Sequence, residues 1–125
     1  MVSGGVELFA GGVRDEQFGP VVLFGSGGVL LELIEDTAAG LAPLDEAGAL
    51  RLIRTTRAHR LLRGFRGNAA VDIERLAAAV AAISRVAALP DVLAIDVNPL
   101  IVLPGGISVV DAKIVKARGA DAAEG

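Results

Sequence analysis

Four polar residues near the C-terminal end of the chain have side chains and spacing that suit a divalent cation. Asp96 and Asn98 are two positions apart, and so are Asp111 and Lys113. Because side chains alternate between the two faces of a strand, the members of each pair share a face if both segments are extended. Carboxylate and amide oxygens suit Mg²⁺, which usually takes one or two carboxylates and completes its shell with phosphate oxygens and water.

The turn between the two segments decides how these side chains face one another. The sequence Leu-Pro-Gly-Gly at Leu103–Gly106 suits a type II turn, with proline second and glycine third. In that register Asn98 stands opposite Asp111 and Asp96 opposite Lys113, and directly paired side chains lie about 5 Å apart. Asn98 and Asp111 could then hold one ion from one side. A Gly-Gly turn would shift the pairing by two residues and still leave Asn98 and Asp111 on the same face. A shift by one residue would bury the acids, so we expect one of the two registers that keep the polar side chains together.

The remaining positions of this hairpin are almost wholly apolar, and we expect that face to pack against helices. It comprises Ile95, Val97, Pro99, Ile101, Ser108, Val110, Ala112 and Ile114. The alternative interpretation of the polar face is an ordinary solvated surface with an Asp96–Lys113 ion pair, because antiparallel sheets are commonly half exposed. The pattern alone leaves both interpretations open.

The rest of the chain predicts a second hairpin and two helices. We expect strands at 6–13 and 20–24, and strands at 93–103 and 107–115. One helix begins at the N-cap Asp45 and ends at the glycines 64 and 67, and the other begins at Asp72 and ends before Pro90. The second helix has a buried stripe at 73, 76, 80 and 83. This order predicts an α+β fold, in which an antiparallel sheet carries two main helices on one face.

A glycine-rich segment follows the second predicted strand. Gly25, Gly27 and Gly28 surround Ser26, and a bare backbone of this kind can offer N–H groups to a phosphate. The segment is not a Walker A loop, because no Lys-Ser/Thr pair follows, and Leu30 replaces the last glycine of a G-x-G-x-x-G motif. A tight turn is the alternative interpretation.

Composition limits the classes of function. The 125 residues include no cysteine, so a disulfide or a thiolate metal site is excluded. A net charge of −3 and an aromatic content of four phenylalanines argue against nucleic-acid binding, despite the arginines that recur between 51 and 66. The sequence has neither a secretory signal nor an apolar run that could span a bilayer, so we expect a soluble, cytoplasmic protein without a membrane partner.

The chain is unusually apolar for its size, with 53% hydrophobic residues and a mean hydropathy of +0.59. A small domain exposes much of its surface, so such a sequence predicts one of two arrangements. Either alanine accounts for the excess, or an apolar face packs against another domain or a second copy of the chain.

Several sequence blocks occur together in one order. The final hairpin contributes Asp96–Leu100 (DVNPL) and Val109–Ile114 (VVDAKI); the earlier blocks are Gly5–Leu8 (GVEL), Asp15–Val22 (DEQFGPVV), Phe24–Gly28 (FGSGG), Leu41–Leu44 (LAPL) and Leu61–Gly67 (LLRGFRG). This set resembles the ATP-grasp domain of NDP-forming acyl-CoA synthetases and is similar to the β subunit of succinyl-CoA synthetase. The resemblance covers about residues 1–115. It implies the C-terminal half of an ATP-grasp domain at 1–117, followed by a flexible tail at 118–125.

The resemblance implies roles for individual residues. Asn98 and Asp111 would bind the Mg²⁺ of ATP or ADP, with Asp96 in support. Glu7, near the nucleotide hinge, could approach the ribose or a basic residue, or it could be an ordinary strand carboxylate. The family's reaction converts an acid, CoA and ATP into acyl-CoA, ADP and phosphate through a phosphohistidine. Mg²⁺ would neutralise phosphate charge during in-line transfer.

The resemblance also implies partners. The first half of the ATP-grasp domain would lie before Met1, and the CoA-binding and phosphohistidine domains would lie elsewhere. We therefore expect the chain to be inactive alone and to act as part of a ligase. The alternative is a non-catalytic regulatory or structural module, as in the synthetase-like regions of some protein acetyltransferases.

Overall fold

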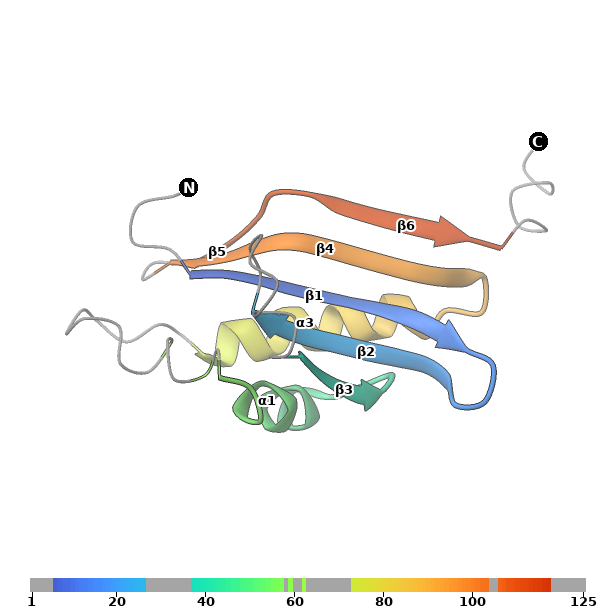
Figure 1. Ribbon diagram of the computed structural model, residues 1–125, viewed down its shortest axis with the longest axis horizontal. Helices are drawn as coiled ribbons and strands as arrows, with labels where there is room; N and C mark the ends of the chain where they lie inside the picture. The colour runs from blue at the N-terminus through green and yellow to red at the C-terminus, as the bar shows by residue number, and fades with distance from the viewer. Residues whose placement is uncertain are drawn as a thin grey trace.

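The computed structural model describes residues 6–26, 37–57, 59, 62, 73–103 and 106–117. Its strands are β1 (Val6–Asp15), β2 (Gly19–Ser26), β3 (Thr37–Leu41), β4 (Val92–Leu103), β5 (Gly106–Val109) and β6 (Ala112–Lys116), and its helices are α1 (Glu46–Arg54) and α3 (Ile73–Ala87). The strands pair in antiparallel fashion in the order β3-β2-β1-β4-β5, and β6 also pairs with β4. Both helices lie on one side of this sheet (Figure 1), so the predicted α+β fold is confirmed.

Several predictions concern residues outside the described ranges. They are the hinge before residue 6, the glycines Gly27 and Gly28, the segment 29–34, the cap Asp72, the centre of the turn at 104–105 and the tail at 118–125.

The first hairpin forms as the sequence predicts. In the turn between β1 and β2, the Asp15 carboxylate accepts hydrogen bonds from the backbone N–H groups of Gln17 and Phe18, at 2.8 and 2.9 Å. Gly19 has a φ of 78°, a conformation that glycine adopts at little cost. Strand β2 runs on to Ser26 rather than ending at residue 24, so Gly25 belongs to the sheet.

Helix α1 begins where the sequence predicts and ends earlier. The Asp45 carboxylate accepts a 2.7 Å hydrogen bond from the N–H of Gly48, which satisfies one of the free donors of the first turn. Helix α1 ends at Arg54 and residues 55–57 form turns, so the predicted single helix is interrupted there, although residues 59 and 62 are helical again. The hydroxyls of Thr55 and Thr56 donate to main-chain carbonyls three residues back, an interaction that competes with helix extension.

Helix α3 carries the predicted apolar stripe. Leu76 and Val80 are fully buried, and Ile73 and Ile83 are partly buried against the same cluster. Ser84 connects this helix to the segment before α1, because its hydroxyl accepts a 2.8 Å hydrogen bond from the N–H of Leu44. It also donates to the carbonyl of Ala81 at 2.6 Å, so this buried polar group is satisfied.

We call the side of the sheet that α1 and α3 cover the helix face, and the opposite side the outer face. The helix face is lined by alternate residues of each strand, among them Val6, Leu8, Ala10, Val22, Phe24, Leu100 and Val102, all buried in one cluster with both helices. Helix α3 packs against β1, β2 and β4, and α1 packs against α3, β2 and β3. A Cβ at Gly12 would lie 2.6 Å from that of Ala87, so this glycine allows α3 to approach β1 closely.

Strand β3 was not predicted. It pairs with β2 from Val21↔Leu41 to Gly25↔Thr37 and forms one edge of the sheet. Its sequence, TAAGL, has neither β-branched alternation nor aromatic residues, so it lacks the local pattern of a strand. The strand is therefore stabilised by its pairing with β2 and its packing against α1, and not by the strand propensity of its own residues.

Strand β4 contains an irregularity that the sequence analysis missed. Leu8 pairs with Leu100 but Ala10 pairs with Val97, so one residue of β1 stands opposite two of β4, Asn98 and Pro99. This extra residue is a β-bulge, and it reverses the alternation of side chains beyond it. The prediction that Pro99 and Ile101 share the helix face with Ile95 and Val97 is therefore wrong. Leu100 and Val102 take those positions.

The second strand of the final hairpin is also divided. The predicted strand 107–115 is present as β5 and β6, separated by Val110 and Asp111 beside the bulge. Ile114 pairs with Ile95 but is 51% exposed, and Val110 is 59% exposed, so the prediction that these side chains pack under helices is wrong. Strand β6 lies at the sheet margin beside β4, whereas α3 packs chiefly under β1, β2 and β4.

Neither α1 nor α3 is long and apolar enough to cross a membrane, and no other helix in the described ranges is.

Candidate functional site

The final hairpin has the register that its turn predicts. Leu103 pairs with Gly106, and on the other side of the bulge Asp96 pairs with Lys113. Between them the N–H of Asn98 donates to the carbonyl of Asp111 at 3.2 Å. The pairing therefore keeps one register from Ile95 to Leu103. The predicted pairings of Asn98 with Asp111 and of Asp96 with Lys113 are confirmed.

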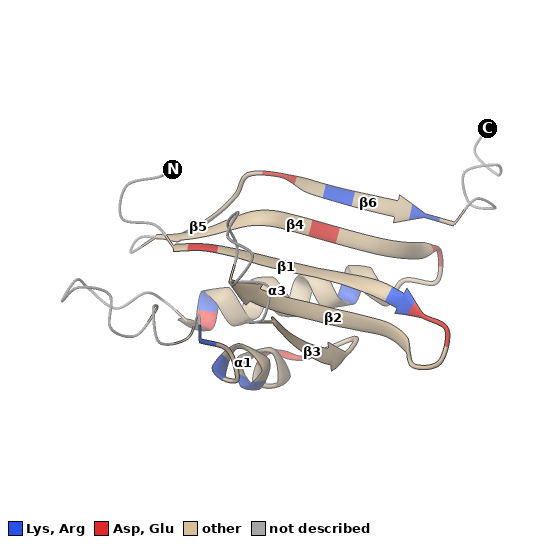
Figure 2. Cartoon of the chain, in the orientation of Figure 1, with Lys and Arg blue, Asp and Glu red and all other residues tan. Residues whose placement is uncertain are grey.

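The four polar side chains share the outer face. Val97 is buried on the helix face, so its neighbours Asp96 and Asn98 face outward. Their cross-strand partners Asp111 and Lys113 lie on the same side, and all four residues are exposed. Figure 2 shows the acidic segment of β4 next to a basic segment of β6, with a further acidic segment just before β6.

This arrangement presents two carboxylates and one amide from two adjacent chain segments. Within the described ranges, no group of three or more His, Cys, Asp or Glu side chains is placed to enclose a metal ion. The set is too small for an all-protein cage and has the size expected for Mg²⁺ that also binds phosphate oxygens and water. Hard oxygen donors on an accessible surface fit such an ion.

Two further predicted site residues, Glu7 and Gly25, lie near the start of β1. Glu7 is partly buried and pairs with Ile101, which places both on the outer face. Gly25 pairs with Phe9 on one side and Thr37 on the other, so it is a central strand residue rather than part of a loop. Gly27 and Gly28 lie outside the described residues.

One residue at the site, Gly11, had no role in the predictions from the sequence. Asp96 has Lys113 as its neighbour on β6 and Gly11 as its neighbour on β1. On the β1 side, therefore, no paired side chain lies beside the carboxylate on the outer face. A Cβ at Gly11 would lie 2.5 Å from the carbonyl oxygen of Ile95, which shows how closely β1 and β4 approach. Consecutive glycines inside a strand are the sequence signal for such an approach.

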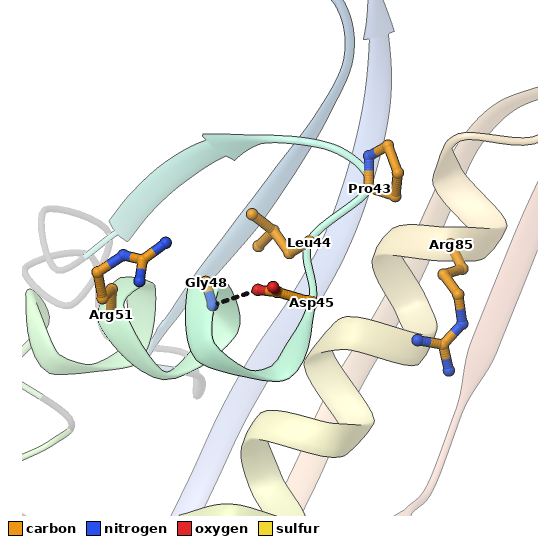
Figure 3. A pocket seen from close by; sticks show the side chains of 6 residues that line it. All are labelled: Pro43, Leu44, Asp45, Gly48, Arg51 and Arg85. Carbon is orange, nitrogen blue, oxygen red and sulfur yellow. Dashed lines mark hydrogen bonds between the residues drawn. The ribbon is translucent and has the colours of Figure 1, made fainter.

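A hollow of about 570 Å³ lies on the other side of the molecule, at the start of α1. Figure 3 shows the residues that line it: Pro43, Leu44, Asp45, Gly48, Arg51 and Arg85. The Asp45 carboxylate already caps α1, and the two arginines extend from different helices. Because these residues belong to the helix layer, the hollow is separate from the polar group of the outer face.

The family model described as an ATP-grasp domain matches residues 1–115, which is almost the whole chain. The chain belongs to the ATP-grasp family. The described residues of this ATP-grasp chain include the hairpin with Asn98 and Asp111, and the matched range includes every site residue predicted above.

The relatives of this ATP-grasp chain are acyl-CoA synthetases. It is 40% identical over 116 residues to acetate–CoA ligase [ADP-forming] I of Archaeoglobus fulgidus, covering 92% of this chain and 17% of that protein. It is 38% identical over 112 residues to acetate–CoA ligase [ADP-forming] I subunit beta of Pyrococcus furiosus, covering 89% of this chain and 48% of the subunit.

Solved structures give the same result. The dinucleotide forming acetyl-coenzyme A synthetase 1 of Ca. Korarchaeum cryptofilum is 44% identical, with a TM-score of 0.83 over 93% of this chain and 55% of that one. That structure is a complex with coenzyme A and Mg-AMPPCP, and its phosphohistidine segment points towards the nucleotide binding site. This ATP-grasp chain therefore spans between about a sixth and just over half of the proteins it resembles.

Proposed function

We propose that this chain is the metal-binding part of an ADP-forming acyl-CoA synthetase, which makes acyl-CoA, ADP and phosphate from an acid, CoA and ATP. The observation that carries the proposal is the group formed by Asn98, Asp111 and Asp96 on the outer face. The chain's membership of the ATP-grasp family and its similarity to acetate–CoA ligases support this class of reaction. Nucleotides and CoA are cytoplasmic metabolites, so the proposal includes a cytoplasmic location.

In this proposal Asn98 and Asp111 hold Mg²⁺ directly, and Asp96 supports it from the adjacent position. The bound ion would neutralise charge on the nucleotide phosphates and align them for in-line transfer. The protein side of the site is fixed by the strand pairing, because the N–H of Asn98 donates to the carbonyl of Asp111. This backbone hydrogen bond keeps the two proposed ligand residues opposite each other on one face.

The nucleotide would lie over the outer face, with Glu7 at the ribose end. Glu7 supports this assignment because it is on the same face as Asn98 and on an adjacent strand. The role of the segment Gly25–Gly28 in binding phosphate is part of the same proposal. Gly25 itself is paired inside β2, so in this proposal it would act as a strand residue and not as part of a loop.

Other parts of the synthetase would complete the site. The chain covers 48% of a related β subunit, so we propose that the first half of the ATP-grasp domain, the CoA-binding domain and the phosphohistidine domain act with it. An apolar row of Val13, Ala94 and Val115 crosses β1, β4 and β6 on the outer face, and both valines are about half exposed. Such a row suits coverage by the missing half or by a second copy of the chain.

The test is the affinity of the chain for Mg-AMPPCP, measured by calorimetry. The measurement is made with and without the first half of the ATP-grasp domain, added as a separate polypeptide. We expect Asp111→Ala and Asn98→Ala each to weaken binding by about tenfold or more, as expected for loss of a charged or metal-bound contact. Glu16→Ala, at an exposed acid of the β1–β2 turn, is the control and should bind like the wild type. Equal affinity of the wild type and Asp111→Ala in the reconstituted pair would refute the metal assignment.

The alternative function is a non-catalytic regulatory or structural ATP-grasp-like module. This alternative differs from the proposed function in catalysis and not in nucleotide binding. This alternative predicts that adding the missing domains restores no acyl-CoA synthesis, even where Mg-nucleotide binding is intact. Sedimentation of the chain alone would show in addition whether its apolar row pairs with a second copy.

A further inference from the structure

The charges of the outer face are unbalanced for a nucleotide site. Glu7, Asp96 and Asp111 contribute three negative charges, and a nucleoside triphosphate contributes about four more, against two positive charges from one Mg²⁺. Among the described strands, Lys113 provides the one cationic side chain on this face. The charge balance therefore points to this lysine as part of the site.

Lys113 is free to meet a ligand as far as the described residues are concerned. Asp96 is its cross-strand partner, yet no hydrogen bond or ion pair joins the two side chains within that part of the chain. Exposed pairs of this kind contribute little to stability, so the lysine is not committed to the carboxylate. Gly11 pairs with Asp96 on the side away from Lys113 and contributes no side chain there.

We propose that Lys113 binds the terminal phosphate of the nucleotide, beside the metal held by Asn98 and Asp111. The inference rests on the proposed function and assigns it a further binding residue. An ammonium group is a compact charge with three donors on a flexible stem, which suits the oxygens of a phosphate. Lys113 is two positions from Asp111 on the same face, so the lysine would reach the phosphate that the metal also contacts.

The same strand supplies a matched control. Lys116 is also an exposed lysine of β6, but its partner Val92 is buried, whereas the partner of Lys113 is the exposed Asp96. Lys116 therefore lies on the helix face. Loss of either lysine changes the net charge by the same amount, so Lys113→Met and Lys116→Met differ in the face on which the charge is lost.

The experiment compares Mg-AMPPCP with AMP as probes of the chain reconstituted with its first half. We expect Lys113→Met to weaken Mg-AMPPCP binding by about tenfold, since hydrogen bonds to charged groups contribute about 1.5–3 kcal/mol. AMP lacks the terminal phosphates, so its affinity should be unchanged. Lys116→Met should bind both probes like the wild type, and Lys113→Arg should recover part of the loss. Thermal unfolding without nucleotide should be the same for both methionine variants.

The outcomes separate this inference from the function on which it rests. If Asp111→Ala loses affinity for Mg-AMPPCP but Lys113→Met and Lys116→Met bind alike, the Lys113 assignment is wrong and the proposed function stands. If the wild type binds no Mg-AMPPCP, or Asp111→Ala binds as well as the wild type, both proposals fail. Equal weakening of AMP and Mg-AMPPCP by Lys113→Met would also overturn the assignment, because it would indicate a general effect on the site.

Discussion

The helix face and the outer face use the same strands for different purposes. On the helix face, Leu8, Phe24 and Leu100 are fully buried in one cluster with the helices. On the outer face, Asp96 and Asp111 are exposed, and their side chains make no hydrogen bond or ion pair with another described residue. Folding free energy is therefore concentrated on one side of the sheet and ligand chemistry on the other, so substitutions on the two faces should have separable effects.

The largest expected effect is at the centre of the helix face. Leu100→Ala removes a fully buried side chain and should lower the free energy of unfolding by about 2–5 kcal/mol, because the cavity cannot fully close. Leu100→Met keeps the volume and should cost less than about 1.5 kcal/mol. Urea denaturation followed by circular dichroism measures both. A loss below about 1 kcal/mol for the alanine variant would show that the site is not a packed core.

A smaller effect is expected where α3 approaches β1. Gly12→Ala places a methyl group 2.6 Å from the Cβ of Ala87, and the overpacking should cost about 1–3 kcal/mol. Gly40→Ala is the control on the same face, since its Cβ would lie 3.6 Å from the nearest atom, a methyl carbon of Leu52. In a double-mutant cycle Ala87→Gly should relieve part of the Gly12→Ala penalty. Additive effects would mean that the two residues are not in contact.

The smallest effect on stability is expected on the outer face. Asp111→Ala and Lys113→Met remove exposed side chains and should change the free energy of unfolding by no more than about 0.5 kcal/mol. The same variants should have the largest effects on Mg-nucleotide binding, which reverses the ranking found on the helix face. Chemical denaturation without ligand is the measurement. Destabilisation by more than about 1 kcal/mol would assign these residues a structural role.

The sequence was informative where structure depends on neighbours along the chain. The turn residues gave the register of the final hairpin, and Asp45 marked the start of α1, because both signals lie within a few residues of the feature. The periodicity of α3 identified Leu76 and Val80 as buried for the same reason. It follows that the grouping of Asn98 with Asp111 on one face could be predicted without knowledge of the rest of the sheet.

Features that depend on a third strand could not be predicted in this way. Strand β3 has no pattern of its own, and its pairing with β2 is what defines it. The bulge at Asn98–Pro99 becomes visible only when β1 is laid beside β4, since the pairing with β5 and β6 keeps one register from Ala94 to Leu103. The same applies to Gly11, whose position next to Asp96 comes from the β1–β4 pairing.

The bulge at Asn98–Pro99 makes β4 two half-strands with opposite phase. In the first half, odd-numbered residues such as Ile95 point into the protein; in the second half, even-numbered residues such as Leu100 do so. When the alternation of apolar and polar residues is counted over the whole of β4, the two halves have opposite phase and the pattern averages out. One extra residue thus allows a ligand-bearing segment and a core-forming segment to follow each other in a single strand without a loop between them.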